Sequence, residues 1–277
     1  LQQARDRVFV VTFSGANGTM ASFDGKGHEL EALMAEEFGL GVPDISWHAA
    51  RDRIAEIASI FAIIGGTLAR IAQEVYLLMA SEIGELSEGY TEGVVGSSTM
   101  PHKINPINSQ HIMGAARTLR YDAAHCIECM LIDHEHNLVH FHDERLTVER
   151  MGRTMGELLE RSYELIHTLH VDEKRMRKNL DILKGAVQSE NVMLKLGEKI
   201  GKMTAKNIVT ELAVKAIRED AFLSDLLSND PRVSAHLSSE EISQLLDPSQ
   251  YAGAAAEIAL DYVKKVRSIK GKGGLHG

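Results

Sequence analysis

The chain is poor in cysteine and carries no excess of positive charge. Two cysteines in 277 residues do not make a disulfide framework. Lysine and arginine total 30 against 39 aspartate and glutamate residues, which gives a net charge of −9 without any basic run. Nucleic acid is not expected as a partner, because phosphate backbones are bound by clustered positive charge. These scarcities favour a reducing, cytoplasmic setting.

Long apolar runs and a leader-like beginning are also missing. The longest apolar stretches are broken by Arg, Glu or Gln before membrane-spanning length, so we expect no membrane helix. The first five residues, LQQAR, show no signal-peptide pattern. Because Leu1 is not an initiator, we expect the chain to begin partway through a longer protein.

Only five prolines occur, and the middle of the chain is almost free of helix breakers. Its apolar residues recur at alternating steps of three and four, which predicts a long helix packing along other helices, reaching about Ile83. We expect Asp44 or Ser46 to cap this helix, and the pair Gly65-Gly66 to allow close helix–helix approach. The apolar positions are Ile54, Ile57, Phe61, Ile64, Leu68, Ile71, Val75 and Leu78.

Two more long helices are expected, from Pro106 to about Leu131 and from about Glu144 to His170. Their predicted inward positions are Ile107, Ile112, Leu119, Ile127, Leu131, Val148, Met151, Met155, Leu158, Ser162, Ile166 and Leu169.

The helical pattern then becomes shorter, and no convincing alternating pattern appears beyond residues 8–13. The fold class is therefore all-α, with a central long-helix bundle domain in residues 1–171 and a small C-terminal helical domain and tail in residues 172–277. Helices this long cannot bury their apolar seams in a monomer of this size, so we expect association.

The most informative segment is residues 96–106, GSSTMPHKINP. Asn105 suits an N-cap and Pro106 the first helical position. Free N–H groups, the positive end of the helix dipole and Lys103 would then converge on one spot that favours a carboxylate. The preceding Glu88 and Gly89, with Gly93 and Gly96, are typical of a mobile loop. Ordinary turn and cap chemistry is the alternative interpretation.

The same segment meets the pattern Gly-Ser-Ser-x-Met-Pro-x-Lys-x-Asn letter for letter and so resembles the signature of the fumarase/aspartase superfamily. That resemblance implies a homotetramer built on a central bundle of long helices, with each active site shared between three subunits. It also implies that the family's N-terminal domain is largely absent from this chain. Neither a cofactor nor a metal is expected.

The resemblance further implies the chemistry and its residues. Members remove a proton next to a carboxylate and stabilise an aci-carboxylate dianion, which requires fixed positive charge and N–H donors. The implied base is Ser97. Lys103 and Asn105 would hold the carboxylate beside that proton. The full set of implied substrate-binding residues, including two carboxylate-binding hydroxyls and a pocket wall, is Ser98, Thr99, Met100, Lys103 and Asn105.

Residues 14–19 (SGANGT) resemble a glycine-rich segment of both the adenylosuccinate lyase and the 3-carboxy-cis,cis-muconate cycloisomerase branches. Two further segments resemble the cycloisomerase branch: residues 45–56 (ISWHAARDRIAE) and 246–255 (LDPSQYAGAA). His136 stands where adenylosuccinate lyases typically have arginine, which argues against a nucleotide substrate. A cycloisomerase-like enzyme acting on a small polycarboxylate is the first hypothesis. The alternatives are adenylosuccinate lyase or another fumarate-forming C–N or C–O lyase, and an inactive helical scaffold or fragment. The exact substrate stays open.

Three polar clusters have simpler interpretations. His134, His136, His140 and His142 resemble a metal site, but polar lining or no site is favoured because no closed zinc pattern accompanies them. Cys126 and Cys129 are expected to be two small, partly buried thiols within a helix, rather than a redox pair. The run from Arg51 to Arg53 is interpreted either as salt-bridged capping or as subunit-interface support.

Overall fold

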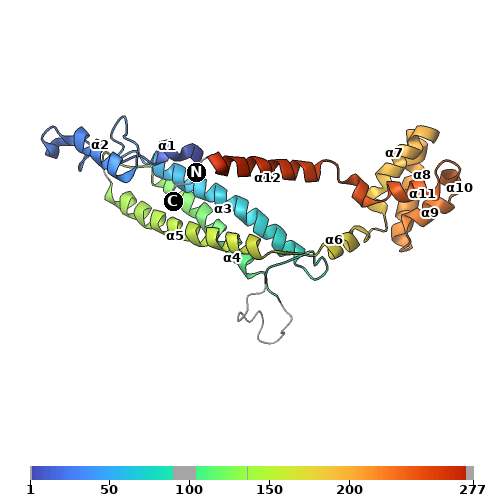
Figure 1. The fold of residues 1–277 in the computed structure, drawn as a ribbon. Coiled ribbons are helices and arrows are strands. Elements are labelled where there is room, and N and C mark those ends of the chain that lie inside the picture. Colours follow the sequence, from blue (N-terminus) through green and yellow to red (C-terminus); the bar gives the residue numbers. More distant parts are fainter. Residues whose placement is uncertain (1, 90–103, 136, 273–277) are drawn as a thin grey trace. The chain divides into compact units, whose positions relative to one another are not determined.

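The computed structural model describes residues 2–89, 104–135 and 137–272, and the chain divides into two compact units, Leu1–Asp172 and Glu173–Gly277 (Figure 1). The first unit contains η1 (Gln2–Ala4), α1 (Arg5–Val8), η2 (Ala21–Phe23), α2 (Gly27–Phe38), α3 (Asp52–Leu78), β1 (Leu86–Ser87), α4 (Ile107–Glu128), α5 (Leu138–Thr168) and β2 (His170–Val171). The second contains α6 (Glu173–Leu180), η3 (Ala186–Gln188), α7 (Ser189–Ile200), α8 (Lys202–Arg218), α9 (Leu223–Asn229), α10 (Pro231–Ser234), α11 (Ser239–Leu245), η4 (Pro248–Tyr251) and α12 (Ala255–Lys272). The predicted all-α class is confirmed.

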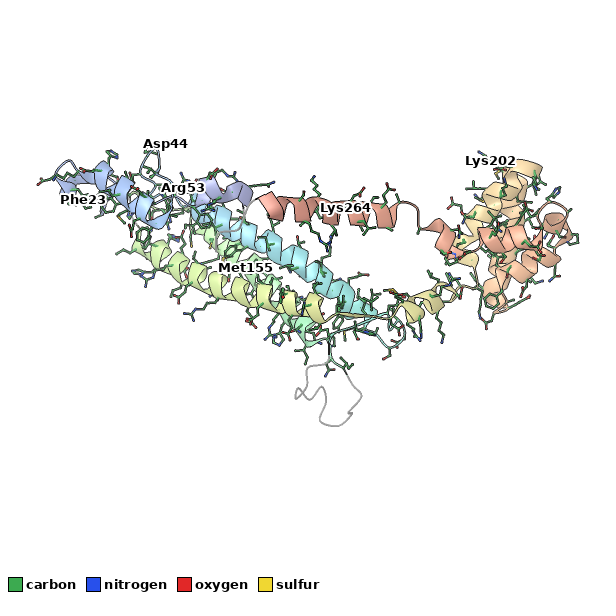
Figure 2. The ribbon with its side chains drawn as sticks, in the orientation of Figure 1. Phe23, Asp44, Arg53, Met155, Lys202 and Lys264 are labelled. Atoms are coloured by element: carbon green, nitrogen blue, oxygen red, sulfur yellow. The ribbon has the colours of Figure 1, made fainter. Side chains whose placement is uncertain are left out.

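The first unit is built on α3, α4 and α5, with α4 packed against both of the others. Its core combines large side chains of α4 and α5 with small side chains of α3. Figure 2 marks one of the former, Met155 of α5. A Cβ added to Gly65 would lie 3.1 Å from Leu119 Cδ1, whereas one added to Gly66 would meet nothing within 4 Å. The predicted close approach is therefore confirmed at Gly65 alone.

The ends and buried face of α3 differ from the prediction. Neither Asp44 nor Ser46 caps this helix, because Arg51 occupies the N-cap position without a side-chain cap bond. The helix ends at Leu78 instead of reaching Ile83. Its buried residues are the small Ala55, Ala58, Gly65 and Ala72, together with Val75. Most large seam residues are half-buried in this chain, because the close approach of α4 selects small side chains for the contact.

The faces of α4 and α5 are also partly different. Three predicted inward positions of α4 are exposed, Ile107 by 37%, Ile127 by 52% and Leu131 by 69%, while Ile112 and Leu119 are fully buried. On α5 the predicted Ile166 is exposed. Helix α4 ends at Glu128, short of Leu131, and α5 starts at Leu138, six residues before the predicted Glu144. Packing against the neighbouring helices, rather than the apolar pattern alone, decides which of these side chains are buried.

Helix α3 is the one described helix that is long and apolar enough to cross a bilayer, with a mean hydropathy of 1.7 over its most apolar window. The apolar stretch of α3 is nevertheless interrupted by Glu56 and Arg70, as expected from the sequence. Only 17% of the window is buried within the chain. A single such helix is weak grounds for a membrane span, since a long bundle helix has the same composition.

Residues 8–13 do not form a strand. Val8 ends α1, and Val10 forms one parallel bridge with Gly41. The regular strand pairing among the described residues is the antiparallel pair of β1 and β2, each two residues long. Sequence periodicity cannot reveal strands of this length, because they contain no repeat.

The second unit has short helices with well-defined ends. Gly185 and Gly201 adopt positive φ angles of 84° and 87° where one helical segment gives way to the next. Helices α7, α8, α9 and α11 surround a core of aliphatic side chains. The sequence interpretation placed the start of this domain at residue 172, and the contact-based division falls between Asp172 and Glu173.

Candidate functional site

The described residues on either side of residues 90–103 meet at the N-terminus of α4. The Glu88 carboxylate accepts hydrogen bonds from the Asn108 N–H at 2.9 Å and the Ser109 N–H at 2.8 Å. Its side chain is buried, with 5% of the residue exposed. The anion held by this helix start is therefore the chain's own carboxylate, supplied from 20 residues earlier.

The start of α4 lies one residue later than predicted. Pro106, not Asn105, occupies the N-cap position and α4 begins at Ile107. The Asn105 carbonyl accepts a hydrogen bond from the Ile107 N–H at 2.9 Å. Proline has no side-chain oxygen to cap the helix, and Glu88 fills that role by binding the second and third N–H groups.

Glu88 and Gly89, which the sequence analysis assigned to a loop, are each in contact with a helix of the bundle. Leu86 pairs with Val171 and Ser87 with His170. A Cβ on Gly89 would lie only 2.4 Å from the Thr168 Cβ, so no larger residue fits without a shift. Residues 86–89 therefore contact both the end of α5 and the start of α4.

The structure locates one of the six predicted site residues. Asn105 is half-buried directly before α4, close in the chain to the helix start that Glu88 caps. Ser97, Ser98, Thr99, Met100 and Lys103 lie outside the described residues, so their roles stay predictions. Sequence reasoning missed Glu88 as a capping residue because nothing in its local pattern indicates a partner 20 residues away.

A shallow groove of about 450 Å³ begins one turn into α4. It is lined by Gln110, His111, Gly114, Ala115, Thr118, Thr154 and Glu157. Near it, the Ser109 hydroxyl is buried without a hydrogen-bond partner among the described residues. The α4 start therefore combines a capped end, an unpaired hydroxyl and an adjacent hollow.

The other end of the bundle holds a buried ion pair. Arg51 donates through Nε to both Glu144 carboxylate oxygens, at 3.1 and 3.0 Å, and through Nη2 to one of them. The Arg51 guanidinium also lies 5.3 Å from the Phe141 ring centroid and 5.9 Å from that of Trp47. Arg53 binds the Arg7 carbonyl. Within this chain the arginines join α3 to α5 and to α1 by tertiary contacts.

The glycine-rich residues 14–19 lie close to the start of residues 45–56. Gly15 and Gly18 have positive φ angles of 72° and 78°, and a Cβ on Gly18 would lie 3.1 Å from Ser46 Oγ. The hydroxyls of Ser14 and Ser46 are buried without a hydrogen-bond partner among the described residues. Two of the segments that carry the family resemblance are therefore neighbours in the fold.

Cys126 and Cys129 are both free and buried. Burial raises the pKa of the Cys126 thiol to about 12, with a further contribution from Glu144. Burial also raises the pKa of Cys129, and the nearby Asp143, Glu144 and Glu128 carboxylates add to this effect. Both thiols are therefore protonated at neutral pH unless a cation binds, which argues against a redox pair.

The group of ligand atoms that the structure forms differs from the four histidines for which the sequence favours polar lining or no site. Outside the undescribed His136, the other three histidines do not join a group of converging ligand atoms. The cluster found among the described residues consists of His125, Cys129 and Asp143. Its signal in the sequence is the spacing of His125 and Cys129, four residues apart on one helix face.

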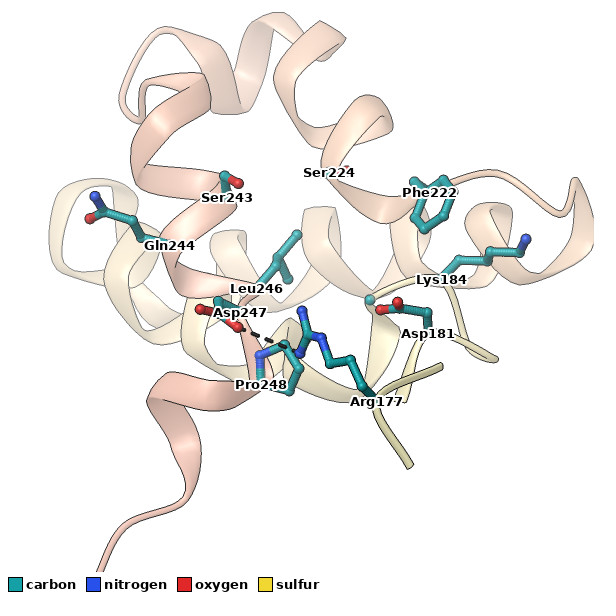
Figure 3. A pocket seen from close by; sticks show the side chains of 11 residues that line it. Arg177, Asp181, Lys184, Phe222, Ser224, Ser243, Gln244, Leu246, Asp247 and Pro248 are labelled. Carbon is teal, nitrogen blue, oxygen red and sulfur yellow. Dashed lines mark ion pairs between the residues drawn. The ribbon is translucent and has the colours of Figure 1, made fainter. Parts of the chain in front are cut away.

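The second unit contains a separate pocket of about 360 Å³, drawn in Figure 3. Arg177 forms an ion pair of 3.6 Å with Asp247 at this pocket. Lys184 lies nearby and pairs with Asp220 at 3.2 Å. Both cations thus have carboxylate partners within the chain, so the pocket offers no unpaired positive charge from them.

Comparison with known proteins adds family information to this geometry. The family model described as "Lyase" matches residues 1–120, and the model described as "Adenylosuccinate lyase C-terminus" matches residues 185–261. The first covers α1 to α3 and more than half of α4, and the second covers most of the C-terminal unit.

Three individual proteins are similar over nearly the whole chain. An N-acetyl-S-(2-succino)cysteine lyase of Dickeya dadantii is 36% identical, with 93% of this chain and 57% of that protein covered. A 3-carboxy-cis,cis-muconate cycloisomerase of Pseudomonas aeruginosa is also 36% identical, with 92% and 56% covered. The crystal structure of 3-carboxy-cis,cis-muconate lactonizing enzyme from Pseudomonas putida matches with a TM-score of 0.84 at 33% identity, covering 92% of this chain and 56% of that one. The chain thus spans just over half the length of these relatives.

Proposed function

Because the chain belongs to the fumarase/aspartase superfamily, we propose that it forms part of an enzyme that removes a proton beside a carboxylate of a small polycarboxylate. The reaction passes through an aci-carboxylate. At the neighbouring carbon a bond to oxygen, nitrogen or sulfur is then either formed or broken. The observation that carries this proposal is the similarity of more than nine tenths of the chain to both a lyase and a cycloisomerase. The names of both relatives contain a carboxylate compound.

The proposed base is Ser97, which takes the proton from the carbon next to the carboxylate. Positive charge from Lys103 and donors from Asn105, Ser98 and Thr99 stabilise the dianion. Met100 forms an apolar wall of the site. Because Glu88 already occupies two N–H groups at the start of α4, these side chains rather than that helix end carry the substrate carboxylate.

We propose further that the enzyme is a cytoplasmic homotetramer whose active sites are shared between subunits. The support is the exposed apolar surface of the bundle helices. Only 17% of the most apolar window of α3 is buried in a single chain. Large side chains such as Ile63, Leu146 and Tyr163 are exposed on α3 and α5. Association buries such surface and stabilises long helices.

The first proposed substrate is 3-carboxy-cis,cis-muconate, on which a lactone is formed or opened. A specific observation favours a second candidate, a thioether of succinate, because the Dickeya lyase is as similar to this chain as the Pseudomonas cycloisomerase is. Adenylosuccinate is the third, supported by the family match of residues 185–261. A scaffold without activity is the alternative from another class.

The test is an ultraviolet assay of the purified protein with each of the three compounds, repeated with Ser97→Ala. We expect turnover of 3-carboxy-cis,cis-muconate, and a loss of kcat of about 10²–10⁴-fold in the variant, which is the usual contribution of a positioned base. Ser268→Ala, in α12, serves as the matched control and keeps wild-type rates.

The outcomes of this assay test the proposed substrate, the role of Ser97 and the scaffold alternative separately. Turnover of the succinyl thioether or of adenylosuccinate alone would replace the proposed substrate while leaving the proton abstraction. Equal rates in wild type and Ser97→Ala would contradict the role of Ser97. Silence with all three compounds would rule out these substrates and direct the search to other fumarate-forming substrates. The intact mass of the native polypeptide would then distinguish a complete enzyme from the scaffold alternative.

A further inference from the structure

His125, Cys129 and Asp143 bring three different metal-binding atoms together where α4 ends and α5 begins. The His125 Nε2 lies 3.0 Å from an Asp143 carboxylate oxygen and 3.7 Å from the Cys129 Sγ. All three ligand atoms lie within 4.8 Å of one another. The site is reached from solvent through the partly exposed His125 and Asp143, while Cys129 is buried.

Two of these separations are close to the edges of a zinc tetrahedron, and the third, between the Asp143 oxygen and the Cys129 Sγ, is at most 4.8 Å. Zinc binds histidine nitrogen and carboxylate oxygen at about 2.0–2.2 Å and thiolate sulfur at about 2.3 Å. Tetrahedral angles then separate the nitrogen from the oxygen by about 3.4 Å and from the sulfur by about 3.6 Å. The observed 3.0 and 3.7 Å require shifts of only a few tenths of an ångström.

The contacts do not fit a catalytic triad of cysteine, histidine and aspartate. In such a triad the imidazole uses one nitrogen toward the nucleophile and the other toward the carboxylate. Here the Asp143 oxygen and the Cys129 sulfur both approach the same Nε2. A single proton on Nε2 could only be shared between the two partners, whereas a lone pair directed at a cation that the Asp143 oxygen and the Cys129 sulfur also bind uses all three atoms.

Charge also favours a divalent cation. Thiolate and carboxylate together supply two negative charges, so a complex with one zinc ion and a neutral imidazole has no net charge, as a buried sulfur requires. The carboxylates of Glu128 and Glu144 lie close enough to act on Cys129 as well. Glu144 is neutralised by its ion pair with Arg51. The carboxylates of Asp143 and Glu128 therefore leave an excess of negative charge around Cys129.

We propose that His125, Cys129 and Asp143 form a binding site for zinc or a similar divalent transition metal, with its fourth position open to water or a small ligand. His125 lies in the last turn of α4, Cys129 is the C-cap residue directly after that helix, and Asp143 comes from the second turn of α5. A bound ion therefore joins two helices that are connected by residues 129–137. The site is independent of the proposed reaction and lies about 25–30 Å along α4 from the end that Glu88 caps.

The test uses the intact protein, freed of metal under reducing conditions. Zinc alone is titrated while stoichiometry is followed by native mass spectrometry, and cobalt replaces zinc for absorption spectroscopy. We expect one ion per chain and a thiolate-to-cobalt charge-transfer band. Loss of the thiolate ligand in Cys129→Ser should weaken binding at least about 100-fold, since outer-shell changes alone cost 10–100-fold.

Cys129→Ser changes a buried side chain and could disturb folding. Asp143→Asn avoids this problem, because the Asp143 side chain is more than half exposed. We expect this variant to weaken zinc binding by more than about tenfold. Cys126→Ser is the matched control for the thiol. His28→Gln is the control for a histidine–carboxylate pair without sulfur, since His28 lies 3.7 Å from Glu31. Both controls should bind like wild type.

Two results would overturn the proposal. One is the absence of stoichiometric binding or of a thiolate band in the wild type. The other is unchanged affinity in both Cys129→Ser and Asp143→Asn, which would assign the zinc to other histidines. A rise in the thermal unfolding midpoint with zinc, present in the wild type and absent in Asp143→Asn, would support the link between α4 and α5.

Discussion

The two units stabilise the starts of their helices in different ways. In the C-terminal unit the cap is local: Ser238 and Glu241 form a capping box on α11, and Asp230 caps α10. In the bundle, α4 is capped by Glu88 from 20 residues away. Asn137 at α5 is the local exception. A cap from a distant residue positions the helix end relative to the surrounding fold. At α4 this fixes the backbone next to the proposed site residues.

The hydrophobic cores of the two units also differ, in the size of their side chains. Fully buried leucine, isoleucine and valine side chains dominate the C-terminal unit. The bundle core instead contains several alanines, a cysteine and methionines, and large apolar side chains remain exposed along α3 to α5. The small residues allow close packing of long helices, and the exposed large ones provide surface for the association proposed above.

The largest expected effect is at the buried ion pair of the bundle. Glu144→Ala leaves Arg51 charged and buried, which should lower the free energy of unfolding by about 3–5 kcal/mol in urea titrations. The control is Glu149→Ala, also on α5, which removes an exposed pair with Arg153 and should cost no more than about 0.5 kcal/mol. Equal losses in the two variants would show that the buried pair is no more important than a surface one.

Glu88→Ala tests the non-local cap itself. Two N–H groups at the start of α4 lose their acceptor, so we expect the free energy of unfolding to fall by about 2–3 kcal/mol. Glu88→Gln retains one carbonyl oxygen and should recover about half of that loss. If the glutamine variant were as unstable as the alanine variant, the charge rather than the hydrogen bonds would be responsible.

Gly65 and Gly66 provide a matched pair for the close approach of α3 and α4. Gly65→Val places methyl groups against Leu119 and Ala116 and should cost about 1–3 kcal/mol, as overpacking does. Gly66→Val enters open space and should change stability by less than about 0.5 kcal/mol. Thermal unfolding of both variants, compared at equal concentration, checks this. A reversed order would contradict the close α3–α4 contact.

The local cap of the C-terminal unit should contribute less. Ser238→Ala removes the acceptor for the Glu241 N–H and should lower stability by about 1 kcal/mol. Ser239→Ala, one residue later, should stay within about 0.5 kcal/mol of wild type. Urea unfolding followed by circular dichroism distinguishes the two. A loss at Ser238 as large as that at Glu88 would remove the contrast between local and distant capping.

The smallest expected effect is a change with pH. The hydrogen bond from Arg232 holds the pKa of Asp230 below its ordinary value of 3.8. As the pH falls below about 4, the unfolded chain takes up this proton before the folded one does, so the contribution of Asp230 to stability is lost. Thermal midpoints measured on acidification should therefore fall less in Asp230→Asn, which keeps a capping oxygen. Parallel acid profiles of variant and wild type would contradict this.

Much of the fold could be predicted from the chain because long helices repeat their pattern many times. The seam around Ile64 predicted α3, and the change to shorter helical patterns predicted the separate C-terminal domain. Buried faces were harder to predict. Ile127 and Ile166 suit a core by composition but are exposed in this chain, since packing against neighbouring helices decides which face turns inward.

The sequence by itself determined the helix class, the family and the residues proposed for the chemistry, because periodicity and a dense motif are local properties of the chain. Only the tertiary structure decided that Glu88 caps α4, that Arg51 pairs with Glu144, and that Asp143 joins His125 and Cys129. Each of these contacts unites residues separated by one or more helical turns or whole helices. Their free energy depends on distances and burial in three dimensions, which no local pattern contains.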